Sequence, residues 1–402
     1  MHRLNWSLLS LFSICLIGIS SSVSAQDFLR LRDGKTLTGI SVRAVTVDGV
    51  YLTTDARISW GQIQSGGVNA DHREKFDKYL KGLSEPLYLI GQRLRVRDDS
   101  SLTEIMGQVD ETISLESGPT AMLIHTASFW GLVANGRREE AAIPLLRCYL
   151  LSQSAEAIGA DVPEGRAIQF DTATGFSADL LPVWHDSKAA KQVLPELNEM
   201  LSKLDVIPES TFIMYSTLAL AARQHEEADR ILQQLSTTRD ITKNMASAVR
   251  LQRAYLLGDE SGLQLVNALE PSIRSMEIPS QIIANYWSGL VLLKSTNDLD
   301  QQKAMVHLIT VAGKHGQRYP QLAASSLYAI YNLLADQRDR FVVGLSKAER
   351  QASRAAIRHE IVSRYSATSI AKRFEVASDD DRTLSLIHIS EPTRRYAISY
   401  AV

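Results

Sequence analysis

The chain has 402 residues, of which 45% are hydrophobic and 22% are charged, with 22 Gly, 11 Pro and 2 Cys. These values are close to those of soluble globular proteins, so they exclude the collagen-like, disordered and disulfide-dense classes. The 43 basic and 45 acidic residues give a formal net charge of −2. Such a balance creates no strong overall field, so we expect no binding to nucleic acid or to an anionic membrane surface.

Residues 1–25 have the pattern of a cleaved secretory signal peptide. Arg3 supplies a basic start, residues 8–19 form an apolar run, and the small residues Val23 and Ala25 occupy the positions that signal peptidase reads. The apolar run is shorter than the about 20 residues that span a bilayer. We therefore expect an exported protein, periplasmic or secreted, with no stable membrane anchor after the signal is cleaved.

The other end of the chain, residues 384–402, resembles a translated sequencing adapter. Residues 384–394 are similar to one reading frame of a transposase adapter, and residues 398–402 are similar to the primer site that comes after it. Segments of this kind are excluded from fold reasoning. We therefore expect the natural sequence to end near Thr383, and Cys148 is then the one cysteine of the mature protein.

Residues 26–66 predict a small β module. Apolar and polar residues alternate there, and the alternation is interrupted by Asp33-Gly34 and by Asp48-Gly49. Asp-Gly pairs between alternating segments are typical of hairpins, because Gly accepts the positive φ of a tight turn. We expect four or five short antiparallel strands in an SH3-like or Sm-like arrangement. A module of about 40 residues is near the lower limit for independent folding, so it is expected to dock on the helical part of the chain.

From about residue 71 to 375 the apolar residues follow a helical period. One helical hairpin is predicted around Arg223–His225, where an apolar helix ends and Glu226-Glu227-Ala228 opens the next. The apolar stripe of the first of these helices consists of Phe212, Tyr215, Leu218, Ala219 and Ala222. A second copy of the phrase runs from Gly136 to Ala141, with a turn residue, an acidic pair and a small Ala.

These phrases resemble the tetratricopeptide (TPR) repeat, in which a turn residue and an acidic pair precede a small Ala. Arg318-Tyr319-Pro320 and Arg364-Tyr365-Ser366 are similar to the linker between consecutive repeats. The spacings depart from the family's repeat of about 34 residues. Leu257-Gly258-Asp259 keeps the turn but is followed by Leu263 where Ala is expected. The resemblance implies a mainly α protein, a TPR-like α-solenoid that binds proteins or peptides on its surface. An irregular helical array of the same general kind is the alternative.

A long insertion interrupts the helical pattern at about residues 154–186. It is rich in Gly and Pro and contains three large aromatic residues, Phe170, Phe176 and Trp184. A loop of this length in a compact domain is usually functional or disordered, and its aromatic content argues against disorder. We therefore expect these three aromatic side chains to contact a partner.

The insertion also holds the best candidates for chemistry, Asp171, His185 and Asp186. One His and two carboxylates could bind a metal ion or act as a base and an acid, which would make the protein an exported hydrolase. In the simpler interpretation the two carboxylates cap turns or helices, Trp184 packs against the helices and His185 faces solvent. We favour the simpler interpretation, and predict no metal and no cofactor.

Arg350, Arg354 and Arg358 recur every four residues and share one face of a predicted helix. Such a ridge could bind an anionic partner, or it could be a solvated face balanced by Glu349 and Glu360. Together, the sequence predicts an exported scaffold or adaptor that binds a protein or peptide partner, with the hydrolase as the alternative.

Overall fold

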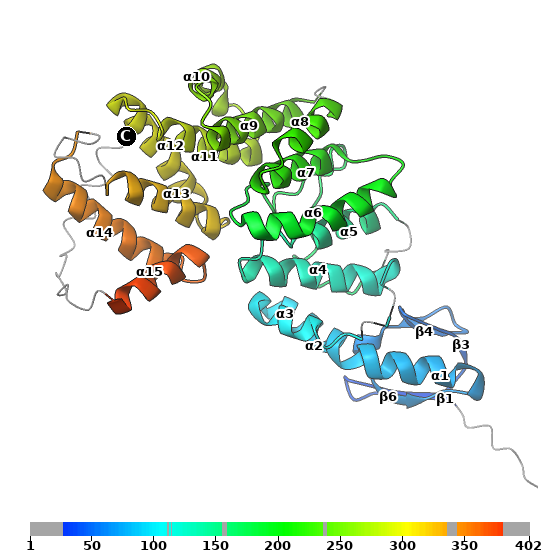
Figure 1. Ribbon diagram of the computed structural model, residues 1–402. Coiled ribbons are helices and arrows are strands. Elements are labelled where there is room, and N and C mark those ends of the chain that lie inside the picture. Colours follow the sequence, from blue (N-terminus) through cyan, green and yellow to red (C-terminus); the bar gives the residue numbers. More distant parts are fainter. Residues whose placement is uncertain are drawn as a thin grey trace, which may run out of the picture. The chain divides into compact units, whose positions relative to one another are not determined.

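The computed structural model describes residues 27–110, 112–113, 115–154, 159–235, 239–335 and 344–380 (Figure 1). The segments expected to be a signal peptide and an adapter-derived tail both lie outside the described residues. The described chain is mainly helical and begins with a small antiparallel β module, as the sequence predicts.

The chain divides into two compact units. The first comprises Met1–Leu89 with Gln108–Ser114, and the second comprises Ile90–Gly107 with Leu115–Val402. The first unit therefore includes helical residues beyond 66 as well as the strands. The boundary between the units falls within helix α2 (Glu85–Val96).

Two three-stranded antiparallel sheets form the β part of the first unit, with strand orders β2-β1-β6 and β3-β4-β5. The strands are β1 (Asp27–Leu31), β2 (Thr36–Ile40), β3 (Val42–Thr46), β4 (Gly49–Leu52), β5 (Arg57–Ile58) and β6 (Ile63–Gly67). Both Asp-Gly pairs lie in hairpin turns, and Gly34 and Gly49 have φ values of +88° and +140°. The described residues form six strands where four or five were expected, because the chain has an additional two-residue strand, β5, and β6 ends one residue beyond the predicted segment.

The strands share a core with helix α1 (Ala70–Tyr79), which precedes the π-helical turn η2 (Leu80–Ser84). Trp60 is fully buried, and its ring centroid lies 5.6 Å from that of Phe76 and 5.7 Å from that of Tyr79, both on α1. Its indole N–H donates to the Thr46 carbonyl at 3.0 Å. The small β module thus gains from α1 the apolar area that its own residues cannot supply.

The second unit is an array of helices. They are η3 (Asp99–Ser101), α3 (Leu102–Met106), α4 (Gly118–Ala134), α5 (Ala142–Ser152), α6 (Ser187–Ser202), α7 (Glu209–Ala221), α8 (His225–Gln234), α9 (Asp240–Leu257), α10 (Ser261–Ile273), α11 (Ile278–Leu292), α12 (Asp298–His315), α13 (Pro320–Leu333), α14 (Lys347–Arg364) and α15 (Ser369–Asp380). Several helices pack on the next helix in the chain, among them α7 on α8, α9 on α10 and α11 on α12. Helix α9 also packs on α7 and on α11, so these three form a row (Figure 1).

The predicted hairpin turns occur where the sequence places them. Helix α7 ends and α8 begins around Arg223, which has a φ of +67°, and Gly136 and Gly258 have φ values of +74° and +69°. Ala228 has no exposed surface. A larger side chain there would separate α7 from α8, because close helix packing leaves no room for it.

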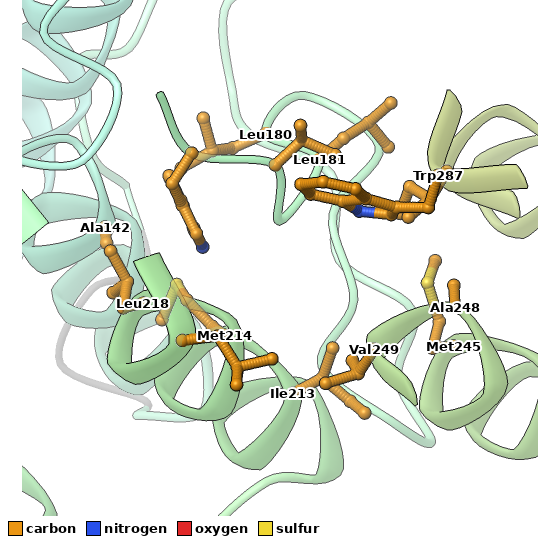
Figure 2. Packing of buried hydrophobic residues seen from close by; sticks show 14 of the residues in the cluster. Ala142, Leu180, Leu181, Ile213, Met214, Leu218, Met245, Ala248, Val249 and Trp287 are labelled. Atoms are coloured by element: carbon orange, nitrogen blue, oxygen red, sulfur yellow. The ribbon is translucent and has the colours of Figure 1, made fainter. Parts of the chain in front are cut away.

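The described part of the insertion, residues 159–186, contains turns and extended chain without a helix or strand. Its apolar residues nevertheless join the main hydrophobic cluster of the helices. Figure 2 shows Leu180 and Leu181 of the insertion with Ile213 and Met214 of α7 and Trp287 of α11. The insertion is therefore an integral part of the core.

Candidate functional site

The insertion is fastened at its end by two consecutive residues, Arg138 and Glu139, from the turn between α4 and α5. Glu139 Oε1 accepts hydrogen bonds from the backbone N–H groups of His185 at 2.7 Å and of Asp186 at 2.9 Å. Arg138 Nη2 donates to the carbonyl of Leu181 at 2.9 Å. Both side chains are buried, so neither is available as a freely solvated charge.

The aromatic residues expected to contact a partner are instead used within the chain. Trp184 is 4% exposed and its indole N–H donates to Thr217 Oγ1 of α7 at 2.7 Å. Phe176 is also buried, and the half-buried Phe170 packs edge-on against Tyr149 of α5 at 5.3 Å. These contacts attach the insertion to the helices, because buried aromatic area stabilises whatever surface covers it.

The two carboxylates considered for catalysis act as caps. Asp171 Oδ1 accepts from the backbone N–H and the hydroxyl of Thr174 at 2.8 and 2.6 Å, and the hydroxyl bond is the main cause that lowers the Asp171 pKa. Asp186 is the N-cap of α6, where Oδ1 accepts from the N–H groups of Lys188 and Ala189 at 2.8 and 3.0 Å. The simpler interpretation of the sequence describes both residues.

His185 keeps contact with solvent but points toward α11 and α13. Its ring lies edge-on to Tyr286 at 6.0 Å, and Nε2 lies 3.3 Å from the hydroxyl of Ser325. The surrounding protein atoms and the positive charges of Arg138 and Arg373 lower the pKa of His185, so the imidazole is neutral at neutral pH.

In this structure the His–Ser pair is not hydrogen-bonded as a base and its nucleophile would be. Ser325 Oγ lies 2.9 Å from the carbonyl of Gln321, closer than it lies to His185 Nε2. The single hydroxyl proton serves the nearer acceptor, so the imidazole N–H is the donor to Ser325. A general base would have to accept that proton instead.

A pocket with apolar walls and a few charged groups lies near this pair, where α4 and the turn after it, the insertion and the start of α13 meet. Its lining residues are Trp130, Val133, Arg138, Asp179, Arg318, Pro320 and Gln321. Arg318 forms an ion pair with Asp179 at 3.3 Å, and the hydroxyl of Tyr319 donates to the carbonyl of Ala178 at 2.6 Å. The pocket thus joins segments that are about 140 residues apart in the sequence.

The ridge of arginines packs against neighbouring helices. Arg350 is buried, the Arg354 guanidinium lies 4.3 Å from the ring centroid of Tyr331 on α13, and Arg358 donates to the Phe374 carbonyl of α15 at 3.3 Å. The three arginines share a face, as the sequence indicates, but this face is only partly solvated: Arg350 is buried, and the half-buried Arg354 and Arg358 lie over aromatic rings.

Sequence reasoning missed Arg138, Glu139, Tyr286 and Ser325. Arg138 and Glu139 lie inside the phrase from Gly136 to Ala141, which indicates a turn between helices but not what the side chains bind. Within the described residues, no group of three or more His, Cys, Asp or Glu is placed to hold a metal ion. Among the helices that the structure describes, none is long and apolar enough to cross a membrane.

Comparisons with family models, curated proteins and solved structures found no match to this chain.

Proposed function

We propose that this chain is an exported scaffold or adaptor that binds a protein or peptide partner through a TPR-like α-solenoid, with its SH3-like or Sm-like β module as a second contact element. The observation that carries the proposal is the row of α7, α9 and α11, each packed with the next helix in the chain. Arrays in which each helical pair contacts mainly its neighbours present extended surfaces, and extended surfaces suit protein recognition.

The pocket beside α13, formed by α4, the turn after it, the insertion and α13, is the part of the helical array with the chemistry of recognition. It combines charged side chains with apolar walls, whereas the apolar side of the insertion is occupied by the core. Binding sites on proteins typically have this composition, with a few placed polar groups on a mostly apolar wall.

Position-specific photo-crosslinking tests the proposal. A photoreactive residue replaces Arg373, which is exposed and electrostatically coupled to His185, and a matched control replaces Val206, which is 82% exposed between α6 and α7. We expect one discrete protein to crosslink from position 373 in an envelope extract and to bind the purified scaffold when isolated. Equal, diffuse labelling from both positions, in a protein folded by circular dichroism, would overturn the proposal.

Export is a separate part of the proposal with its own test. When the full chain is expressed in a bacterium, we expect a shortened protein outside the cytoplasm whose first residue is Gln26. An uncleaved chain that stays in the cytoplasm would contradict export while leaving the binding function open.

A further inference from the structure

The pocket beside α13 is lined by a buried arginine, Arg138, whose charge is stabilised electrostatically by the adjacent Glu139. Arg138 is 7% exposed and donates to the Leu181 carbonyl, and among the described residues no carboxylate forms an ion pair with it. The adjacent Glu139 is already engaged by the N–H groups of His185 and Asp186. An arginine stays charged in proteins, so its remaining N–H donors call for an acceptor.

A second arginine faces the same pocket. Arg318 is 57% exposed at its side chain, and its contact with Asp179 uses one terminal nitrogen. A guanidinium has five N–H donors, so Arg318 can retain Asp179 and still bind a second carboxylate. The lining of the pocket therefore carries two guanidinium groups, those of Arg138 and Arg318, against one carboxylate, that of Asp179.

The other walls of the pocket favour a peptide over a small inorganic anion. Trp130 and Pro320 supply apolar surface beside the two arginines. The indole of Trp130 is held in place, because its N–H donates to the Arg166 carbonyl at 2.9 Å and the Arg166 guanidinium covers its ring at 4.5 Å. A rigid apolar wall next to a cation matches a carboxylate carried on a chain with apolar neighbours.

We propose that this pocket, lined by Arg138, Arg318 and Trp130, is the docking point for a carboxylate of the partner peptide. The proposal rests on the proposed binding function and names the chemistry of its recognition site. The carboxylate comes either from an Asp or Glu side chain or from the end of the partner chain. Two guanidinium groups can bind either one with charge-assisted hydrogen bonds.

Three pools of biotinylated heptapeptides with randomised neutral residues separate these sources. The first pool is amidated and carries a central Glu, the second has a free terminal carboxylate and no acidic residue, and the third is amidated with a central Gln. We expect the full-length protein to bind the first or the second pool at least about tenfold more strongly than the third. Equal binding to all three pools would overturn the proposal, as would displacement by equimolar inorganic phosphate.

Substitutions in the pocket supply the second readout. Arg318→Gln removes an exposed guanidinium and should weaken binding of the preferred pool about tenfold without unfolding the protein. Arg138→Lys keeps the buried charge but loses the planar fork, and should weaken binding by a similar factor. The control is Arg364→Gln, which removes an exposed arginine paired with Glu360 on α14 and should bind as the wild type does.

The outcomes distinguish this proposal from the proposed function. Unchanged peptide binding by both pocket variants would reject the carboxylate site. If the partner still crosslinks from position 373 in that case, the scaffold function stands without it. If no pool binds and no partner crosslinks, both proposals fail.

Discussion

Glu139 and His185 are joined across 46 residues of sequence by a hydrogen bond of 2.7 Å from the His185 backbone N–H to the Glu139 carboxylate. The bond connects the turn before α5 to the end of the insertion, just before α6, so it closes the loop formed by α5 and the insertion. A second bond from the N–H of Asp186 to the same oxygen reinforces it. The pocket depends on this closure, because the turn before α5 supplies its Arg138 and the insertion supplies its Asp179.

Removing the Glu139 carboxylate should therefore destabilise the second unit. Glu139→Ala leaves two N–H groups without their acceptor, for which we expect a loss of about 2–4 kcal/mol in the free energy of unfolding. Glu139→Gln retains one carbonyl acceptor and should lose about 1 kcal/mol. Urea unfolding monitored by circular dichroism measures both. Equal effects of the two substitutions would contradict the role assigned to the acceptor oxygen.

How far the sequence predicted this arrangement can be judged from particular residues. The turns at Gly136, Arg223 and Gly258 were predictable, because positive φ and helix ends leave local signals. The contact of His185 with Ser325 was not, since 140 residues separate them and no local pattern encodes such a pairing.

The aromatic residues show a different limit of sequence reasoning. A Trp in a Gly- and Pro-rich loop indicates that some apolar surface covers it. Whether that surface belongs to another molecule or to a helix 33 residues further along the chain, as for Trp184 and Thr217, is decided only by the tertiary fold. The arginines of α14 show the same limit. Their spacing predicts a shared helix face, but it does not predict whether that face points toward solvent or toward another helix.

The buried imidazole of His125 on α4 predicts a pH dependence of stability. Its Nε2 lies 3.2 Å from the Leu115 carbonyl, and burial, with a smaller contribution from the charge of Arg147, lowers its pKa from 6.5 to about 4. Between these two values the unfolded chain binds the proton more strongly than the folded chain. Stability is therefore fully retained above pH 6.5 and falls toward pH 4, by about 1.4 kcal/mol per unit for this one group.

Comparison of variants isolates this contribution from those of other groups. His125→Asn should flatten the decline of the free energy of unfolding between pH 6 and pH 4.5 by about 1 kcal/mol per unit. The control is His359→Asn, which removes an exposed imidazole from α14 and should match the wild-type curve. Parallel curves for the wild type and His125→Asn would show that His125 does not titrate as its burial requires.

The contact between Arg354 and Tyr331 predicts a measurable coupling between α14 and α13. The guanidinium lies 4.3 Å from the ring centroid, a distance at which cation–π attraction is effective. A double-mutant cycle with Arg354→Met and Tyr331→Leu should give a coupling energy of about 0.5–1 kcal/mol. The exposed ion pair of Arg364 and Glu360 is the reference cycle, with an expected coupling of about 0.3–0.5 kcal/mol. A coupling energy near zero for the first cycle would mean that the Arg354 guanidinium lies beside the Tyr331 ring without attracting it.

Two substitutions of Asp186 distinguish a capping carboxylate from a catalytic one. Asp186→Ala should lower the free energy of unfolding by about 0.5–2 kcal/mol, while Asp186→Asn should be close to the wild type, because Asn is an equally good N-cap. If Asp186 were a catalytic carboxylate, Asp186→Asn would abolish activity, because the amide keeps the shape of the side chain but cannot transfer the proton. Thermal unfolding of both variants, alongside an assay of hydrolysis with generic ester and peptide substrates, makes the distinction. Hydrolysis by the wild type that is lost in Asp186→Asn with unchanged stability would revive the hydrolase alternative.

Because the insertion is anchored in the core, we expect the buried side chain of Leu181 to make a large contribution to stability. Leu181 is 1% exposed within the cluster of Figure 2, and its carbonyl accepts the bond from Arg138. Leu181→Ala should cost about 2–5 kcal/mol, as large-to-small substitutions in packed cores do. Val206→Ala, at a position that is 82% exposed, is the control and should change stability by less than about 0.5 kcal/mol.

Limited trypsin digestion shows whether the insertion itself loosens. Arg166 lies in the insertion and is 6% exposed, and its guanidinium is held by Asp99, so cleavage after it should be slow in the wild type. In Leu181→Ala we expect this cleavage to accelerate more than cleavage at exposed sites such as Lys203, because the insertion loses its apolar anchor while α6 keeps its own. If cleavage at the two sites accelerates equally, Leu181 stabilises the second unit as a whole and the insertion has no separate anchor.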